Sequence, residues 1–262
     1  LMPVRFPSTP GFDVAGEGVE VGSQVTRFRV GDRIFAMLNA RRVRGGAAAE
    51  YALVDESAAA QAPANLSAQE AAAIPLAGLT ALQGLRDLGE IAAGQHVLIV
   101  GASGGVGHFA VQIARHYGAT VTAVASDRRA AMLRALGADR VIDYARERNW
   151  AGRLPYDLVF DVIVRRPIQN FFPWMTSRGV YVSSLPSVGR VAAAVLLPLI
   201  SRRRVRIVGV HARGADLDEL RALCESGALR PVIDRVFPLA ELAGAHAYSQ
   251  QGHTAGKIVV AV

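Results

Sequence analysis

The chain has 262 residues, of which 51% are hydrophobic, so it can bury the core of one large or two ordinary domains and is not a disordered protein. Its formal net charge is +7, but the arginines are scattered rather than gathered into one stripe with aromatic residues, so we expect no nucleic-acid binding. A single cysteine, Cys224, excludes an internal disulfide and a cysteine-rich zinc site.

Residues 1–74 have the pattern of a small β-rich domain. Short apolar runs at 14–22, 29–35 and 51–54 alternate with glycine, as expected of strands joined by turns. We therefore predict a β-rich, barrel-like domain here, with a change of pattern at Pro75.

An alternation of helices and strands begins at Pro75, whose helix is expected to reach Leu88. Six apolar runs predict strands at 97–100, 120–125, 140–142, 157–162, 179–184 and 205–210, the number in a full doubly wound parallel sheet. The tail predicts a helix over 216–226, a strand over 232–237, a helix from Leu239 and a strand over 258–262. The longest apolar stretch, 191–200, is too short to span a bilayer, so a cytoplasmic protein without a membrane partner is expected.

The first strand of this region runs into a glycine-rich turn, which is the most informative feature of the chain. The turn consists of Gly101, Ala102, Ser103, Gly104, Gly105, Val106 and Gly107. Glycine lets the backbone approach a pyrophosphate, and the helix that follows directs free N–H groups at the anion. A strand before the turn and an apolar-striped helix after it complete a dinucleotide-binding pattern. The alternative is a glycine-rich turn without a ligand.

The residues after the second strand indicate which dinucleotide binds. NAD sites usually place an acidic residue here, whereas this chain has Ser126, followed by Arg128 and Arg129. A hydroxyl and two guanidinium groups suit a 2′-phosphate, so NADP(H) is favoured over NAD. Two alternatives stay open: Asp127 pointing toward the ribose, and the arginines forming a solvated first turn of the next helix.

Several segments together resemble the medium-chain dehydrogenase/reductase superfamily, in particular its zinc-free quinone oxidoreductase-like branch. In chain order they are residues 10–16, 30–33, 75–81, 101–107, 137–144 and 256–257. The resemblance implies an α/β fold, with a Rossmann-type doubly wound parallel sheet and a partial GroES-like β-barrel domain. It places the barrel in 1–74, incomplete at its N-terminus because relatives begin well before the equivalent of Leu1. The NADP-binding Rossmann domain is expected in 75–210, and 211–262 is expected to return to the first domain.

The resemblance also implies the cofactor contacts. Thr80 would lie near the nicotinamide, residues 101–107 at the pyrophosphate, and Ser126, Arg128 and Arg129 at the 2′-phosphate, with Tyr144 beside it and Lys257 reaching NADP. Ser183 and His211 follow predicted strands at the carboxyl edge of the sheet, where a cofactor contact and a purely structural role are both open.

No metal is expected in this chain. Zinc-dependent members of the superfamily carry Gly-His-Glu where this chain has Gly11-Phe12-Asp13, and phenylalanine cannot ligate zinc. The six histidines show no ligand spacing, and His108 is interpreted as a structural residue at a helix start. Asp13 is expected to be a structural charge in the barrel.

The resemblance implies a zinc-independent, NADPH-dependent oxidoreductase that transfers hydride to a quinone or an α,β-unsaturated carbonyl substrate. The sequence identifies no catalytic acid; Tyr51 is a candidate that fits a barrel strand better. Residues 161–166 stand where relatives have a glycine pair, which keeps open a catalytically impaired NADP-binding scaffold. A zinc-type alcohol dehydrogenase is the third alternative. The strand at 205–210 is the expected edge for a homodimer.

Overall fold

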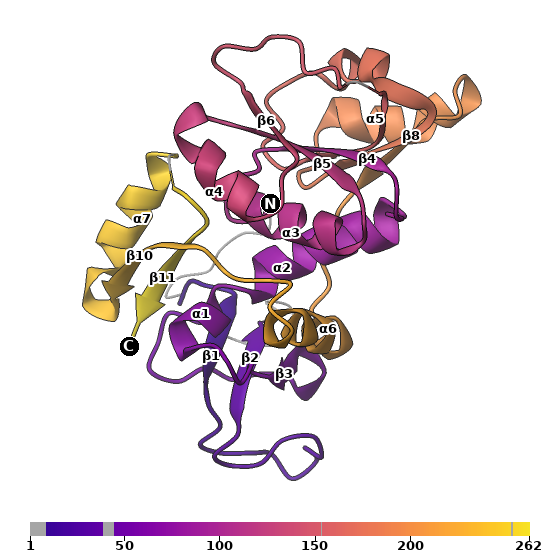
Figure 1. Cartoon of the computed structure of the whole chain (residues 1–262). Helices are drawn as coiled ribbons and strands as arrows, with labels where there is room; N and C mark the ends of the chain where they lie inside the picture. The colour runs from indigo at the N-terminus through magenta and orange to yellow at the C-terminus, as the bar shows by residue number, and fades with distance from the viewer. Residues whose placement is uncertain (1–8, 39–44, 153, 253) are drawn as a thin grey trace. The chain divides into compact units, whose positions relative to one another are not determined.

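The computed structural model describes residues 9–38, 45–152, 154–252 and 254–262 (Figure 1). The chain divides into two compact units. Unit 1 comprises the described residues of 1–79 and 211–262, and unit 2 comprises those of 80–210. The boundary between them falls within helix α2, Pro75–Leu82.

Unit 2 is built on a parallel sheet of six strands, as the sequence predicts. These are β4 (His96–Val100), β5 (Thr120–Ala125), β6 (Arg140–Asp143), β7 (Tyr156–Asp161), β8 (Met175–Ser183) and β9 (Arg204–Ile207), in the order β6-β5-β4-β7-β8-β9. The direction of winding changes between β4 and β7. In doubly wound sheets, ligands bind outside the carboxyl ends of the strands at this switch point.

The helices of unit 2 follow its strands. They are α3 (Gly107–His116), α4 (Ala130–Ala135) and α5 (Val188–Leu196), with short 3₁₀ turns at Asp127–Arg129, Ile168–Asn170, Phe172–Trp174 and Leu197–Leu199. The predicted helix from Pro75 to Leu88 is confirmed, but beyond α2 it continues as a π-helix, Gln83–Leu88, in which Gly89 N–H donates to the Gly84 carbonyl. Helix α3 packs on β4 and β5, and its residues 107–114 are all buried.

Unit 1 contains two small sheets. Strands β1 (Asp13–Glu17), β2 (Arg33–Met37) and β3 (Ala59–Gln61) pair antiparallel, and β10 (Ile233–Pro238) pairs in parallel with β11 (Lys257–Ala261). Its helices are α1 (Ala68–Ala72), α6 (Gly214–Glu225) and α7 (Leu242–Gln250), with 3₁₀ turns at Glu56–Ala58 and Leu239–Glu241. The tail therefore forms the predicted elements in the predicted order.

One predicted strand of unit 1 is wrong. Residues 51–54 form no strand, and the side chains of Tyr51 and Leu53 are 74% and 73% exposed. No strand of the described residues pairs with this segment, whose Ala52 and Val54 are only half-buried. The third strand is β3, whose Ala-Ala-Gln sequence lacks the β-branched and aromatic residues typical of strands. Across the described ranges, no helix combines the length and apolar character needed to cross a bilayer.

Candidate functional site

The glycine-rich turn of residues 101–107 leaves β4 at the switch point of the sheet. Gly101 has φ +80°, a left-handed conformation that glycine adopts without strain. The N–H groups of Gly101 and Ala102 both contact the Val124 carbonyl oxygen at 3.1 Å, which ties the turn to β5. A Cβ on Gly107 would clash with the Gly101 carbonyl oxygen, so only glycine lets α3 begin this close to the strand.

The start of α3 presents backbone donors suited to an anion. Within the described ranges, the N–H groups of Ser103, Gly105 and Val106 make no hydrogen bond to another backbone group, and these residues are partly exposed. His108 is fully buried, with Nδ1 3.0 Å from the Gly104 carbonyl oxygen, as the structural interpretation of this residue requires. The turn therefore has the free donors and the close backbone that the pyrophosphate of a dinucleotide needs.

A second cluster of predicted residues lies at the carboxyl ends of β5 and β6. Ser126 follows β5 and its hydroxyl makes no capping hydrogen bond, while the 3₁₀ turn after it carries Arg128 and Arg129. Tyr144 follows β6, and its N–H donates to the Ala125 carbonyl oxygen at 3.2 Å. The structure thus brings the backbones of four residues predicted to surround a 2′-phosphate to one corner of the sheet.

Arg146 is a further arginine of this corner that the sequence reasoning missed. Its Nε lies 3.5 Å from an oxygen of Asp143, and its Nη1 lies 4.0 Å from an oxygen of Asp127. Asp127 therefore has a cationic neighbour, and the corner holds a third guanidinium group. The three-residue spacing from Asp143 was the signal available in the sequence, but it is common on solvated surfaces.

The turn after β7 lies directly beside the glycine-rich turn. Val162 N–H donates to the Val100 carbonyl oxygen at 3.1 Å. The side chains of Val162 and Ile163 fill the space into which a Cβ on Gly101 would point. Val164 has φ +56°, a conformation that is costly for a β-branched residue. The chain thus makes a glycine-type turn with valine, in the segment where its resemblance to relatives predicts a glycine pair.

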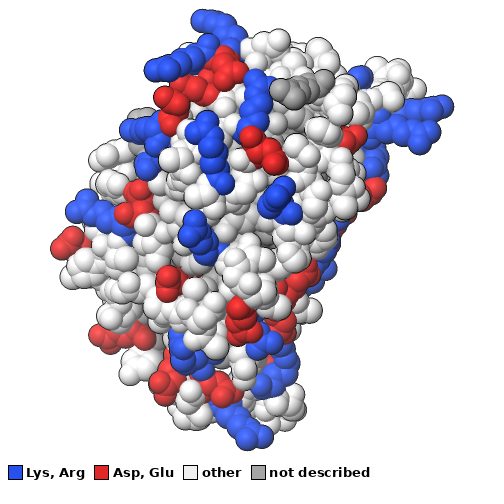
Figure 2. Space-filling model, viewed as in Figure 1, with Lys and Arg blue, Asp and Glu red and all other residues white. Residues whose placement is uncertain are grey.

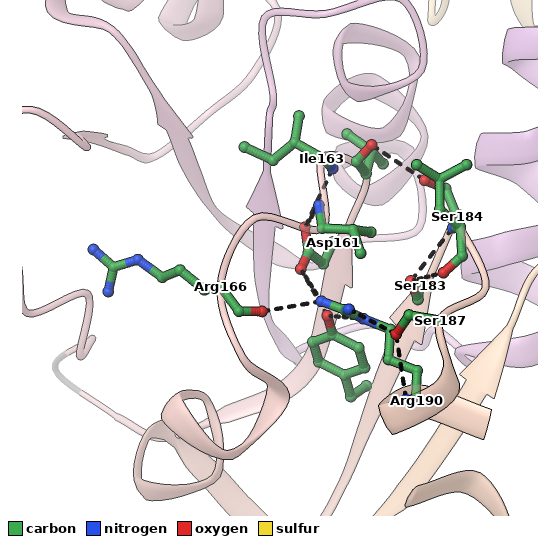
Figure 3. A network of polar contacts seen from close by, with 11 residues as sticks. Asp161, Ile163, Arg166, Ser183, Ser184, Ser187 and Arg190 are labelled. Carbon is green, nitrogen blue, oxygen red and sulfur yellow. Dashed lines mark hydrogen bonds and ion pairs between the residues drawn. The ribbon is translucent and has the colours of Figure 1, made fainter. Parts of the chain in front are cut away.

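Asp161, the last residue of β7, holds this turn from the inside (Figure 3). Its side chain is fully buried, and Oδ1 accepts hydrogen bonds from the N–H groups of Ile163 at 3.2 Å and Val164 at 2.8 Å. Oδ2 accepts from the Tyr181 hydroxyl at 2.6 Å and from Arg190 Nη2 at 3.4 Å. Burial and the Asp161 carboxylate raise the pKa of Tyr181 well above its usual value, so its hydroxyl remains a donor.

Two other predicted cofactor contacts are buried in unit 2. Thr80 lies in α2 with 7% of its surface exposed. Ser183 ends β8 and is fully buried, and its hydroxyl donates to the Leu185 carbonyl oxygen at 2.8 Å. The Ser183 side chain therefore stabilises its own turn, as in the structural alternative for this residue.

His211 and Lys257 belong to unit 1. Lys257 Nζ lies 2.9 Å from Asp13 Oδ2, and Asp13 Oδ1 accepts from Leu76 N–H at 2.7 Å. Asp13 thus has the structural role expected of it. This ion pair borders a cavity of about 250 Å³ within unit 1, whose other polar residues include His246.

The described residues contain no group of three or more histidine, cysteine, aspartate or glutamate side chains that could hold a metal ion. Cys224 is buried in α6, and burial, together with Glu225, raises the pKa of its thiol to about 12. This environment agrees with its interpretation as an inert packing residue.

Surface charge is mixed on the face that Figure 2 shows. Blue and red side chains are interspersed there and form no single continuous basic area. This face therefore lacks the basic stripe that nucleic-acid-binding proteins present.

Comparisons with known proteins match the chain along its length. The family model for the alcohol dehydrogenase GroES-like domain matches residues 2–64, and that for zinc-binding dehydrogenase matches residues 136–260. The chain is 35% identical to the chloroplast envelope quinone oxidoreductase homolog of Arabidopsis thaliana, over 99% of this chain and 82% of that protein. It is 37% identical to the chloroplastic NADPH-dependent alkenal/one oxidoreductase of the same plant, over 97% of this chain and 64% of that protein. The structure of the quinone oxidoreductase from Coxiella burnetii matches with a TM-score of 0.88 and 34% identity, over 98% of this chain and 80% of that one.

Proposed function

Because the chain belongs to the medium-chain dehydrogenase/reductase superfamily, among its quinone oxidoreductase-like proteins, we propose that it is an NADPH-dependent oxidoreductase that reduces a quinone or an α,β-unsaturated carbonyl compound. One observation carries the proposal: the glycine-rich turn and the corner of Ser126, Arg128 and Arg129 lie at the ends of neighbouring strands of the sheet. The relatives named as quinone and alkenal/one oxidoreductases support the substrate class.

The residues of unit 2 provide binding and orientation. Bound NADPH supplies a hydride from C4 of its nicotinamide. The free N–H groups of the turn at 101–107 hold the pyrophosphate at the start of α3. Ser126, Arg128, Arg129 and Tyr144 receive the 2′-phosphate, with Thr80 nearer the nicotinamide. Lys257 and His211 stay predicted cofactor contacts from the sequence, whereas the buried Ser183, whose hydroxyl donates to the Leu185 carbonyl oxygen, has the structural role.

The proposed reaction needs no zinc. Phe12 stands where zinc-dependent relatives carry histidine, and its ring offers no ligand atom. We propose that solvent supplies the proton that follows the hydride, because no acidic side chain is identified for that step. Stoichiometric zinc in the purified protein would overturn this part of the proposal and favour a zinc-type alcohol dehydrogenase.

We propose that the protein is a homodimer. Strand β9 is an edge of the six-stranded sheet, which leaves backbone groups of Arg204–Ile207 open to another strand. Beside it, Val188, Leu199 and Ile200 are 89%, 79% and 86% exposed, an apolar area that a second copy would cover. A monomer by light scattering would contradict this. The cytoplasmic location stays a prediction from the sequence, since several relatives are named as chloroplast proteins.

Replacing Arg129 with alanine tests the cofactor assignment. Loss of one charge-assisted bond to a phosphate weakens NADPH binding by about ten- to a hundredfold and leaves NADH binding nearly unchanged. Arg134→Ala is the matched control, because Arg134 is an exposed arginine on α4, outside the corner. Calorimetric titration with each cofactor measures both affinities.

Equal losses for NADPH and NADH in Arg129→Ala would refute the 2′-phosphate assignment. Tight NADPH binding without oxidation of either cofactor by quinones or enones would instead support the NADP-binding scaffold. The turn made with Val164 is the observation that favours that second function.

A further inference from the structure

We infer that Asp161, Tyr181 and Arg190 are positioning residues for the nicotinamide half of the cofactor site, because they fix the turn of residues 162–165 beside the glycine-rich turn. The inference rests on the proposed function and extends it beyond the phosphate-binding residues. These three side chains form no local sequence pattern, since Tyr181 and Arg190 lie 20 and 29 residues from Asp161 along the chain.

The strand order determines which half of the cofactor meets this turn. The 2′-phosphate corner lies at the ends of β5 and β6, on one side of β4. The turn of 162–165 follows β7, on the other side of β4. A dinucleotide whose pyrophosphate lies over the turn at 101–107 therefore extends its second half toward β7. Because Val162 and Ile163 already lie against Gly101, a small shift of this turn changes the space next to the pyrophosphate.

The Asp161 carboxylate leaves the turn little freedom. Both of its oxygens are occupied, Oδ1 by two N–H groups of the turn and Oδ2 by the Tyr181 hydroxyl and the Arg190 guanidinium. A fully buried carboxylate without these donors would be strongly unfavourable, so the two side chains and the turn adopt one common arrangement. The left-handed conformation of Val164 is consistent with a turn that its surroundings determine.

Arg190 holds the far end of the turn as well (Figure 3). Its Nη2 donates to the Arg166 carbonyl oxygen at 3.0 Å, and its Nη1 donates to the Ser187 hydroxyl at 3.1 Å. Helix α5 buries its arginine and exposes its apolar residues, whereas an ordinary surface helix does the opposite. Arg190 is 7% exposed, and Val188 is 89% exposed. The Arg190 side chain therefore points into the protein, where it donates hydrogen bonds to Asp161 and Arg166, and not into solvent.

Tyr181→Phe tests the inference, with Tyr156→Phe as the matched control. Each substitution removes one buried hydroxyl near β7: that of Tyr181 from Asp161 at the carboxyl end, and that of Tyr156 from the Trp150 carbonyl oxygen, 2.8 Å away, near the opposite end. We expect Tyr181→Phe to lower kcat with NADPH by about ten- to a hundredfold, since misplacement of reacting groups is that costly. The affinity for adenosine 2′,5′-bisphosphate, a probe of the adenosine half alone, stays unchanged. Tyr156→Phe changes neither quantity.

Arg190→Lys keeps the test decisive if Tyr181→Phe does not fold. A lysine retains the charge beside Asp161 but has one nitrogen in place of the three with which Arg190 donates to Tyr181, Ser187 and Asp161, so an intermediate loss of kcat is expected. Arg203→Lys is its control, because the Arg203 guanidinium also binds backbone carbonyls, those of Thr176 and Met175, away from the turn.

Three results separate the inference from the proposed function. Turnover of Tyr181→Phe and Arg190→Lys equal to that of their controls would overturn the inference alone. A parallel loss of bisphosphate affinity would also overturn it, since that would show a general loosening of unit 2. Failure of the wild-type chain to bind NADPH at all would refute the proposed function and the inference with it.

Discussion

Replacing Val164 by glycine and by alanine separates backbone strain from side-chain packing. Both variants lose the isopropyl group, but only glycine relieves the left-handed conformation at φ +56°. That conformation costs an L-residue about 1–2 kcal/mol. Glycine in turn gives the unfolded chain extra entropy, which costs about 0.5–1 kcal/mol of stability. The difference predicts that Val164→Gly is up to about 1.5 kcal/mol more stable than Val164→Ala.

Urea unfolding followed by tryptophan fluorescence measures this difference, because both tryptophans, Trp150 and Trp174, lie in unit 2. Val162 provides the control, since it is not among the residues with positive φ. There the usual order is expected, with alanine more stable than glycine by about 0.5–1 kcal/mol. Finding Val164→Gly less stable than Val164→Ala would refute the strain at this turn.

Gly107, Cys224 and Glu70 each have surroundings that a single measurement can test. Gly107→Ala abolishes NADPH binding in calorimetry because its Cβ has no space at the start of α3, whereas Gly244→Ala, in α7 with nothing within 4 Å of its Cβ, keeps the affinity; equal losses would contradict the role of the glycine-rich turn. The Cys224 thiol, whose pKa is raised to about 12, is expected to react with a thiol reagent only after urea unfolds the chain. Rapid labelling of the native protein would contradict the burial of this thiol. Ser67, through its N–H and hydroxyl, lowers the pKa of Glu70 from its ordinary value of 4.5. The ionised Glu70 carboxylate therefore stabilises the fold above about pH 4.5, and this stabilisation is lost as the pH falls through the lowered pKa of the folded state. Glu70→Gln is expected to flatten the acid part of the plot of stability against pH. An unchanged plot would argue against the capping box of Ser67 and Glu70.

The six-stranded sheet was predictable from the sequence because a buried parallel strand is a nearly continuous apolar run. The prediction for β8 began late, at 179, because its first residues include Ser177 and Arg178, which are exposed and polar. Strand β3 was not predicted because its sequence, Ala-Ala-Gln, contains no residue with a strong preference for strands. Alanine carries little strand preference, and only pairing with β2 and packing of α6 make 59–61 a strand.

Only those residues of the candidate site that lie next to one another in the sequence could be predicted from it. The turn at 101–107 and the arginines after β5 are short, contiguous patterns. Asp161, Tyr181 and Arg190 have no such pattern, since Tyr181 lies 20 residues and Arg190 lies 29 residues from the carboxylate they share. Only the register of β7 with β8 and the inward direction of Arg190 bring them together, and both are set by tertiary packing.

The ion pair between Asp13 and Lys257 joins residues 244 positions apart. Synthesis proceeds from the N-terminus, so unit 2 has all its strands once residue 210 has left the ribosome, while β1–β3 still lack α6 and β11. Strands β1–β3 are therefore made before unit 2 but complete their packing after it. Until α6 and β11 are made, the open edges of β1–β3 can pair with strands of other chains, and this half of the molecule is the one that proteases reach more easily.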